Sequence, residues 1–156
     1  MLAIDIPGFG NLRLEHVVLD YNGTLAEDGK LLDGVAPVLW ALSATLTIHV
    51  VTADTFGRAS EELAGLPLQL VVLGDTNQTQ AKLDFVQQFD VSGVVAIVNG
   101  QNDRRMAGAV ALAVAVVQRE GAAVATLAEA DVVAPGIVQA LELLQNPLRL
   151  IATLRA

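Results

Sequence analysis

The chain has 156 residues, of which 53% are hydrophobic and 17% are charged. This composition excludes an intrinsically disordered chain, and the length suits one compact domain over residues 1–156 that buries roughly two-thirds of its unfolded surface. The absence of cysteine excludes disulfide bonds, thiolate zinc sites and a cysteine nucleophile. A net charge of -8 repels phosphate backbones and therefore argues against nucleic acid as a partner.

The sequence contains no segment that is typical of a membrane protein or a secretory signal. Its most apolar stretch, residues 106–117, is too short to span a bilayer. The amino-terminal residues do not combine a basic start with an apolar run. We therefore expect a cytoplasmic protein with no membrane partner.

Apolar runs and turn residues predict strands that alternate with helices. The chain begins with a hairpin, in which residues 2–6 and 12–14 flank a turn at Pro7-Gly8-Phe9-Gly10. A buried strand is predicted at 16–19, and further strands are predicted at 47–51, 68–73, 94–98, 111–117 and 131–134. Helices are predicted at 35–44, with Asp33 as N-cap, and at 57–64, 78–89, 103–108 and 137–144.

Some segments and side chains have a structural rather than a chemical interpretation. Trp40 and Phe85 are expected in the core, and His16 and His49 are expected to be packed or hydrogen-bonded. Residues 148–155 are apolar with basic ends and could cover a sheet edge or a second subunit, which leaves a homo-oligomer open.

The alternation of strands and helices is typical of right-handed βαβ units. It predicts an α/β protein with a three-layer, Rossmann-like architecture, a mainly parallel open sheet and an N-terminal hairpin. Ligands bind to such sheets beyond the carboxyl ends of the strands. The residues that directly follow each strand are therefore the candidates for a site.

Polar clusters follow three of the predicted strands. They are Asp20-Tyr21-Asn22-Gly23-Thr24, then Thr52-Ala53-Asp54-Thr55, and then Asn99-Gly100-Gln101-Asn102-Asp103. Because Asp, Asn, Gly and Thr are also common in turns, a purely structural interpretation remains open for each cluster alone. Three clusters in sequence order favour convergence on one edge of the sheet.

The residue types in these clusters suit phosphoryl chemistry. Asp20 at a strand tip can act as a nucleophile and form an aspartyl-phosphate. Carboxylate and amide oxygens from Asp20, Asn99 and Asp103, with a backbone carbonyl, could bind Mg²⁺. Thr24 and Thr52 can donate hydroxyl groups to phosphate oxygens, and Lys82 can offset the negative charge of Asp20 and the phosphate.

The order DYNGTL, VVTAD, a lone lysine and NGQND resembles the haloacid dehalogenase (HAD) superfamily. Within it, the motifs are similar to the phosphorylation domain of P-type ATPases, which has D-K-T-G-T, T-G-D, a lysine and G-D-G-x-N-D. The resemblance covers residues 16–144. It implies a HAD-like hydrolase domain without a cap, because predicted elements fill the segments between the motifs in which a cap would be inserted.

The resemblance also implies roles for individual residues. Asp20 corresponds to the nucleophile, Thr52 to the phosphate-binding hydroxyl and Lys82 to the lysine that bridges nucleophile and phosphate. Asn22 falls on the acid/base position, whose backbone carbonyl also binds magnesium. Asn99 and Asp103 fall on the two aspartates of the metal-binding motif. Flanking residues expected to bind substrate are Gly23, Thr24, Ala53 and Asn102.

Two amides stand where the family has carboxylates. Asn22 cannot exchange a proton, and general acid–base catalysis contributes roughly 100- to 10,000-fold in rate. Asn99 removes one negative charge from the cation site. The carboxylate of Asp54 could compensate for this loss, and the alternative is that Asp54 is a helix N-cap or turn residue.

These observations predict a slow, magnesium-dependent phosphohydrolase. Its open site would accept a phosphorylated small molecule or a phosphoprotein. The alternative is a catalytically reduced HAD-fold module that binds or regulates a partner. A receiver-like phosphoacceptor domain also uses a strand-tip aspartate, but the NGT and NGQND pattern argues against it.

Overall fold

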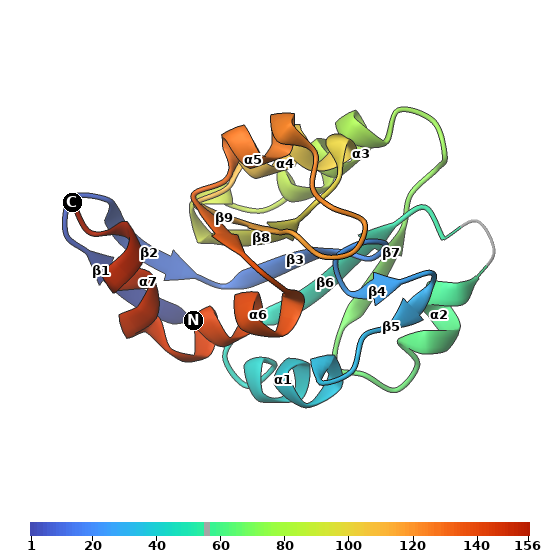
Figure 1. Cartoon of the computed structure of the whole chain (residues 1–156), viewed down its shortest axis with the longest axis horizontal. Helices are drawn as coiled ribbons and strands as arrows, with labels where there is room; N and C mark the ends of the chain where they lie inside the picture. The colour runs from blue at the N-terminus through green and yellow to red at the C-terminus, as the bar shows by residue number, and fades with distance from the viewer. Residues whose placement is uncertain (55–56) are drawn as a thin grey trace.

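The computed structural model describes residues 1–54 and 57–156 and contains a central sheet of six parallel strands (Figure 1). Across the sheet the strands are β10 (Val132–Ala134), β9 (Leu112–Val116), β8 (Val94–Val98), β3 (His16–Asp20), β6 (Thr47–Thr52) and β7 (Gln69–Val72). All neighbouring pairs in this sheet are parallel. The predicted α/β class, open parallel sheet and strand positions are confirmed.

Helices cover both faces of the sheet (Figure 1). One face packs against α1 (Val35–Leu42), α2 (Arg58–Glu62) and α6 (Ile137–Gln145), and the other against α3 (Gln78–Val86), α4 (Arg104–Ala109) and α5 (Val124–Glu129). Val17 and Leu19 of β3 contact the first layer, whereas Val18 contacts the second. Strands buried on both sides need apolar residues at every position, which explains the continuous HVVL and VVAIV runs.

The segment between β3 and β6 is short and fully described. It contains a small hairpin of β4 (Ala26–Glu27) and β5 (Lys30–Leu31), followed by α1. The prediction missed this hairpin, because two-residue strands have no periodicity to detect. The segment therefore contains one small hairpin and one helix.

The predicted N-terminal hairpin is formed by β1 (Leu2–Ile6) and β2 (Gly10–Leu14). The C-terminal segment that could not be placed from the sequence is helix α7 (Pro147–Leu154), which packs on β1 beside the hairpin (Figure 1). The amide of Ala156 donates to the carbonyl of Pro7 at 3.0 Å. Gly8 has a φ of +81°, and a Cβ there would collide with Ala156, so the turn requires glycine.

Two predictions about the first helix are wrong. Asp33 is not its N-cap: α1 begins after Gly34, which has a left-handed conformation, and no side chain caps the helix. Trp40 lies outside the core and is 56% exposed. The helix buries Val35, Leu39 and Leu42, a stripe that leaves position 40 on the outer face.

Two short 3₁₀ helices, η1 (Val91–Gly93) and η2 (Gln101–Asp103), flank β8. Helix α5 (Val124–Glu129) was not predicted. Of the helices in the described ranges, none has the length and apolarity needed to cross a bilayer.

His16, the first residue of β3, and His49, the third residue of β6, form a pair, as the structural interpretation expects. The Nδ1 of His16 and the Nε2 of His49 are 3.1 Å apart, and the rings of Phe85 and Phe89 pack against the pair. His49 is buried, and its Nδ1 has no hydrogen-bond partner among residues 1–54 and 57–156. Burial, with a contribution from His16, lowers the pKa of His49 below its ordinary value.

This depressed pKa makes stability depend on pH. Below about pH 6.5, His49 binds a proton in the unfolded chain but stays neutral to lower pH in the folded protein. The free energy of unfolding therefore falls with acidification. We expect His49→Leu to reduce the loss of stability between pH 7 and pH 5, by less than about 1.4 kcal/mol per pH unit. Urea unfolding of both proteins at the two pH values measures the difference, and parallel losses would contradict the prediction.

Candidate active site

The carboxyl ends of the strands bring the three predicted clusters together. From β3 at the centre, the chain proceeds through β6 to β7 on one side, and then returns to β8 on the other side. The reversal of strand order beside β3 creates a crevice at its carboxyl end. Asp20 is the last residue of β3 and therefore lies at this position.

Lys82 of α3 connects the first cluster with the third. Its Nζ donates to Asp20 Oδ1 at 2.8 Å, to Asp103 Oδ1 at 2.7 Å and to Asn102 Oδ1 at 3.0 Å. An ammonium group has three protons, so these acceptors use its full capacity. Lys82 is only 1% exposed, and a charge at such depth requires partners of this kind.

The electrostatics of this cluster are unbalanced, because two carboxylates face one ammonium group. Burial and the nearby Asp103 raise the pKa of Asp20 to about 7, although Lys82 acts in the opposite direction. Burial alone would lower the pKa of Lys82, but Asp20 and Asp103 together raise it above its ordinary value. Additional positive charge would therefore stabilise ionised Asp20.

Asp103 is fully buried and holds the loop after β8. Its Oδ2 accepts from the backbone N–H groups of Asn99 and Gly100 at 3.2 and 3.0 Å, while its Oδ1 accepts from Lys82. Both carboxylate oxygens thus have partners within the protein. The geometry makes Asp103 an organiser of Lys82 and of this loop.

Thr24 is turned away from the crevice. The backbone N–H groups of Thr24, Leu25 and Ala26 converge on the carbonyl of Tyr21, and the tight turn directs the Thr24 hydroxyl inward to Asn99 Oδ1 at 3.2 Å. Gly23, with a φ of +78°, lies against the same Asn99 amide, which a Cβ would overlap. These two predicted substrate-binding residues instead support Asn99.

Thr52 ends β6 and is buried, and its Oγ1 accepts from the backbone N–H of Asp54 at 3.3 Å. Asp54 itself accepts from the N–H groups of Ala59 and Ser60 in the first turn of α2, at 2.7 and 3.3 Å. The N-cap of α2 is Gly57, so Asp54 bonds to this turn from outside the predicted N-cap position. Thr55 of the second predicted cluster lies outside the described residues.

A hollow of about 300 Å³ opens over Asp20. The predicted site residues that line it are Asp20, Asn22, Thr52, Ala53, Lys82, Asn99 and Asn102. Gly100, Gln78 and Glu120 also line it. The last two were not predicted. The polar run Gln118-Arg119-Glu120 follows the predicted strand 111–117, so the rule of searching strand ends could have found Glu120.

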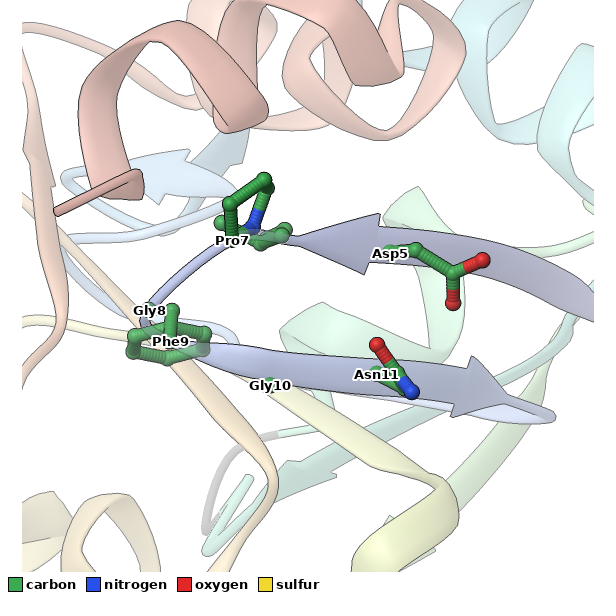
Figure 2. A pocket seen from close by; sticks show the side chains of 7 residues that line it. Asp5, Pro7, Gly8, Phe9, Gly10 and Asn11 are labelled. Atoms are coloured by element: carbon green, nitrogen blue, oxygen red, sulfur yellow. The ribbon is translucent and has the colours of Figure 1, made fainter.

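Two larger hollows lie away from these residues. One of about 640 Å³ lies along α3 and α4, and one of about 460 Å³ lies at the turn of the N-terminal hairpin (Figure 2). Asp5 is the one charged residue among the described residues that line the hollow at the hairpin. Its carboxylate forms an ion pair with Arg13 at 2.7 Å. Neither hollow contains a buried cluster of titratable groups, which is the feature that marks the smaller one as the candidate site.

The donors around Asp20 suit a hard divalent cation. The described residues contain no group of three or more His, Cys, Asp and Glu side chains that could hold a metal ion. Mg²⁺, however, is commonly bound by one or two carboxylates and keeps several waters. The excess negative charge that raises the pKa of Asp20 is an independent reason why a cation fits there.

No family model matches the chain. Over 39 residues it is 44% identical to an uncharacterized protein of Methanocaldococcus jannaschii, a match that covers 25% of this chain and 89% of that protein. The two proteins belong to one sequence family over this segment. The name of the relative states no activity.

Solved structures match the fold over most of its length. The cobalt-bound deoxy-D-mannose-octulosonate 8-phosphate phosphatase of Haemophilus influenzae has a TM-score of 0.71 at 15% identity, with 86% of this chain and 88% of that chain covered. The corresponding phosphatase of Moraxella catarrhalis, in complex with magnesium, phosphate and the sugar acid, has a TM-score of 0.67 at 15% identity, with 90% and 93% covered. That of Yersinia pestis has a TM-score of 0.65 at 15% identity, with 97% and 94% covered.

The chain also matches a putative HAD-superfamily hydrolase of Legionella pneumophila, with a TM-score of 0.71 at 16% identity and 90% of this chain and 88% of that chain covered. It therefore has the fold of the HAD-like hydrolases. The HAD resemblance predicted this fold from the motifs, and the fold prediction is confirmed. The more specific similarity to P-type ATPases is supported by the sequence motifs alone.

Proposed function

We propose that this protein is a phosphohydrolase that acts through an aspartyl-phosphate at Asp20. The observation that carries the proposal is the buried cluster in which Lys82 bonds to Asp20 and Asp103 beneath a polar hollow. In the first step a carboxylate oxygen of Asp20 attacks phosphorus, and the bond from phosphorus to the leaving oxygen breaks. In the second step water attacks phosphorus and releases Asp20.

The other residues of the hollow have supporting roles. Thr52 donates its hydroxyl to a phosphoryl oxygen, and Asn102 and Asp103 position Lys82 so that its charge lies beside the transferring group. Asn22 and Ala53 form the wall against which the phosphoryl group lies.

A divalent cation, Mg²⁺ in our proposal, would be held by the carboxylate of Asp20, the side-chain oxygen of Asn99 and the backbone carbonyl of Asn22. When bound, it supplies positive charge that neutralises phosphoryl oxygens. Asp103 is left out of this set because its two oxygens hold Lys82 and the loop after β8. The Asn99 oxygen accepts from Thr24, so a cation bound there would have to share or displace this hydrogen bond. With one carboxylate among the protein ligands, we expect weak cation affinity.

Hydrolysis of a chromogenic phosphate ester, with and without Mg²⁺, tests this function. We expect slow turnover that requires the added cation and ceases with a chelator. A soak with magnesium and beryllium fluoride, which mimics an aspartyl-phosphate, should place the fluoride complex on Asp20. The absence of both turnover and beryllium fluoride binding would overturn the proposal.

Asn22→Asp is expected to increase turnover. The substitution places a group that can exchange a proton in the wall of the hollow, and such catalysis contributes typically 100-fold or more, of which we expect at least about 10-fold here. Steady-state kinetics on the same ester measures the change. Asn11→Asp, on the distant hairpin, is the matched control and should leave the rate unchanged; equal rates for Asn22→Asp and wild type would contradict the prediction.

A binding or regulatory module is the second candidate. It is favoured by Asn99, whose amide is engaged at both ends by Thr24 and by the carbonyl of Gly121. If beryllium fluoride binds but no phosphate ester is hydrolysed, this candidate is preferred.

A further inference from the structure

The loop at 117–123 connects β9 and α5 (Figure 1). Hydrogen bonds join it to two segments of the candidate site. The side-chain amide of Gln118 donates to the carbonyls of Gly23 and Thr24 at 3.1 and 2.9 Å. The amide of Asn99 donates to the carbonyl of Gly121 at 3.3 Å. The loop is therefore fixed to the segment after β3 at one point and to the segment after β8 at another.

Glu120 lies between these two attachment points. Its neighbour Arg119 forms an ion pair with Glu27 of β4 at 3.2 Å, which adds a third tie on the side of the small hairpin. Glu120 is itself exposed and lines the hollow together with Asp20 and Asn22. A carboxylate on an exposed loop tip would ordinarily be mobile, but here hydrogen bonds restrain its backbone on both sides.

The proton balance of the proposed reaction needs a base at this place. When water attacks the aspartyl-phosphate, it must lose a proton as the bond between phosphorus and Asp20 breaks. Among the described residues that line the hollow, Asp20, Lys82 and Glu120 can titrate. Asp20 carries the phosphoryl group at this stage, and the three protons of Lys82 are bound to protein acceptors.

We propose that Glu120 is the general base that activates water for hydrolysis of the aspartyl-phosphate. The carboxylate takes one proton from the attacking water, the new oxygen–phosphorus bond forms, the bond from phosphorus to Asp20 breaks, and Glu120 then releases its proton to solvent. This inference rests on the proposed function. It explains how hydrolysis proceeds although Asn22 has no titratable group.

Glu120→Gln separates the two chemical steps. We expect kcat to fall by about 100-fold, while the phosphorylated enzyme accumulates, because attack by Asp20 is unaffected and only its release is slowed. Acid quenching and intact-protein mass measurement determine the phosphorylated fraction. Glu120→Asp should keep part of the rate, and Asn22→Asp in the Glu120→Gln background should restore turnover by providing another carboxylate in the hollow.

Glu129→Gln is the matched control, since it removes an exposed carboxylate that lines a different hollow. It should match the wild type in rate and in phosphorylated fraction. A Glu120→Gln rate within about threefold of the wild-type rate would overturn the proposed role of Glu120. A fall in rate without accumulation of phosphorylated enzyme would overturn it as well. If the wild type neither becomes phosphorylated nor hydrolyses esters, the proposed function fails, and the inference fails with it.

Discussion

Asp20→Asn is expected to abolish phosphate-ester hydrolysis, by about 10,000-fold or more, and to leave no phosphorylated protein. An amide oxygen is a poor nucleophile, and loss of a nucleophile is among the most damaging changes to an enzyme that forms a covalent intermediate. Steady-state kinetics and the acid-quenched protein mass provide the two measurements. Residual turnover above about a tenth of the wild-type rate would eliminate the mechanism.

The same variant should remain folded. Burial raises the pKa of Asp20 to about 7, which shows that the ionised carboxylate is costly in the folded protein. Replacement by a neutral amide removes this cost, so we expect the thermal midpoint of Asp20→Asn to equal or exceed that of the wild type. Asp5→Asn, at the exposed hairpin, provides the matched loss of a carboxylate and should keep full activity.

Lys82→Met is expected to reduce both activity and stability. The methionine leaves Asp20 and Asp103 buried without their shared cation, and the removal of one partner from a buried ion pair costs about 3–5 kcal/mol. We expect the free energy of unfolding, measured with urea, to fall by about this amount. Phosphate-ester turnover should fall to background, because the positive charge beside the phosphoryl group is lost.

The chain has only one other lysine, which offers a direct control. Lys30 is exposed on β5, and Lys30→Met should change the free energy of unfolding by less than about 0.5 kcal/mol. Addition of Asp103→Asn to Lys82→Met should recover part of the stability by neutralising one uncompensated carboxylate. Equal stability of the Lys82→Met and Lys30→Met proteins would show that the cluster does not contribute as we infer.

Much of the fold could be predicted because its signals are local. Runs such as HVVL and VVAIV are apolar at every position, as strands buried on both faces must be, and Asp20 and Asn99 directly follow them. Strand ends in a parallel sheet share one edge, so the sequence order of the clusters was sufficient to predict that Asp20, Thr52 and Asn102 would line one hollow. The strands β4 and β5 were missed because two residues contain a single period of the strand pattern.

The amino-acid sequence by itself determined the fold class and the position of Asp20 at a strand tip, and the family resemblance of its motifs linked Asp20 to Lys82. Only the tertiary structure decided that Thr24 faces Asn99 rather than the crevice, that Asp54 bonds to the first turn of α2 and that Glu120 lines the hollow. The physical reason is that strand formation depends on residues that are neighbours in the sequence, whereas the direction of a loop side chain depends on hydrogen bonds to distant segments. Gln118 and Thr24, for example, are hydrogen-bonded although 94 positions separate them in the sequence.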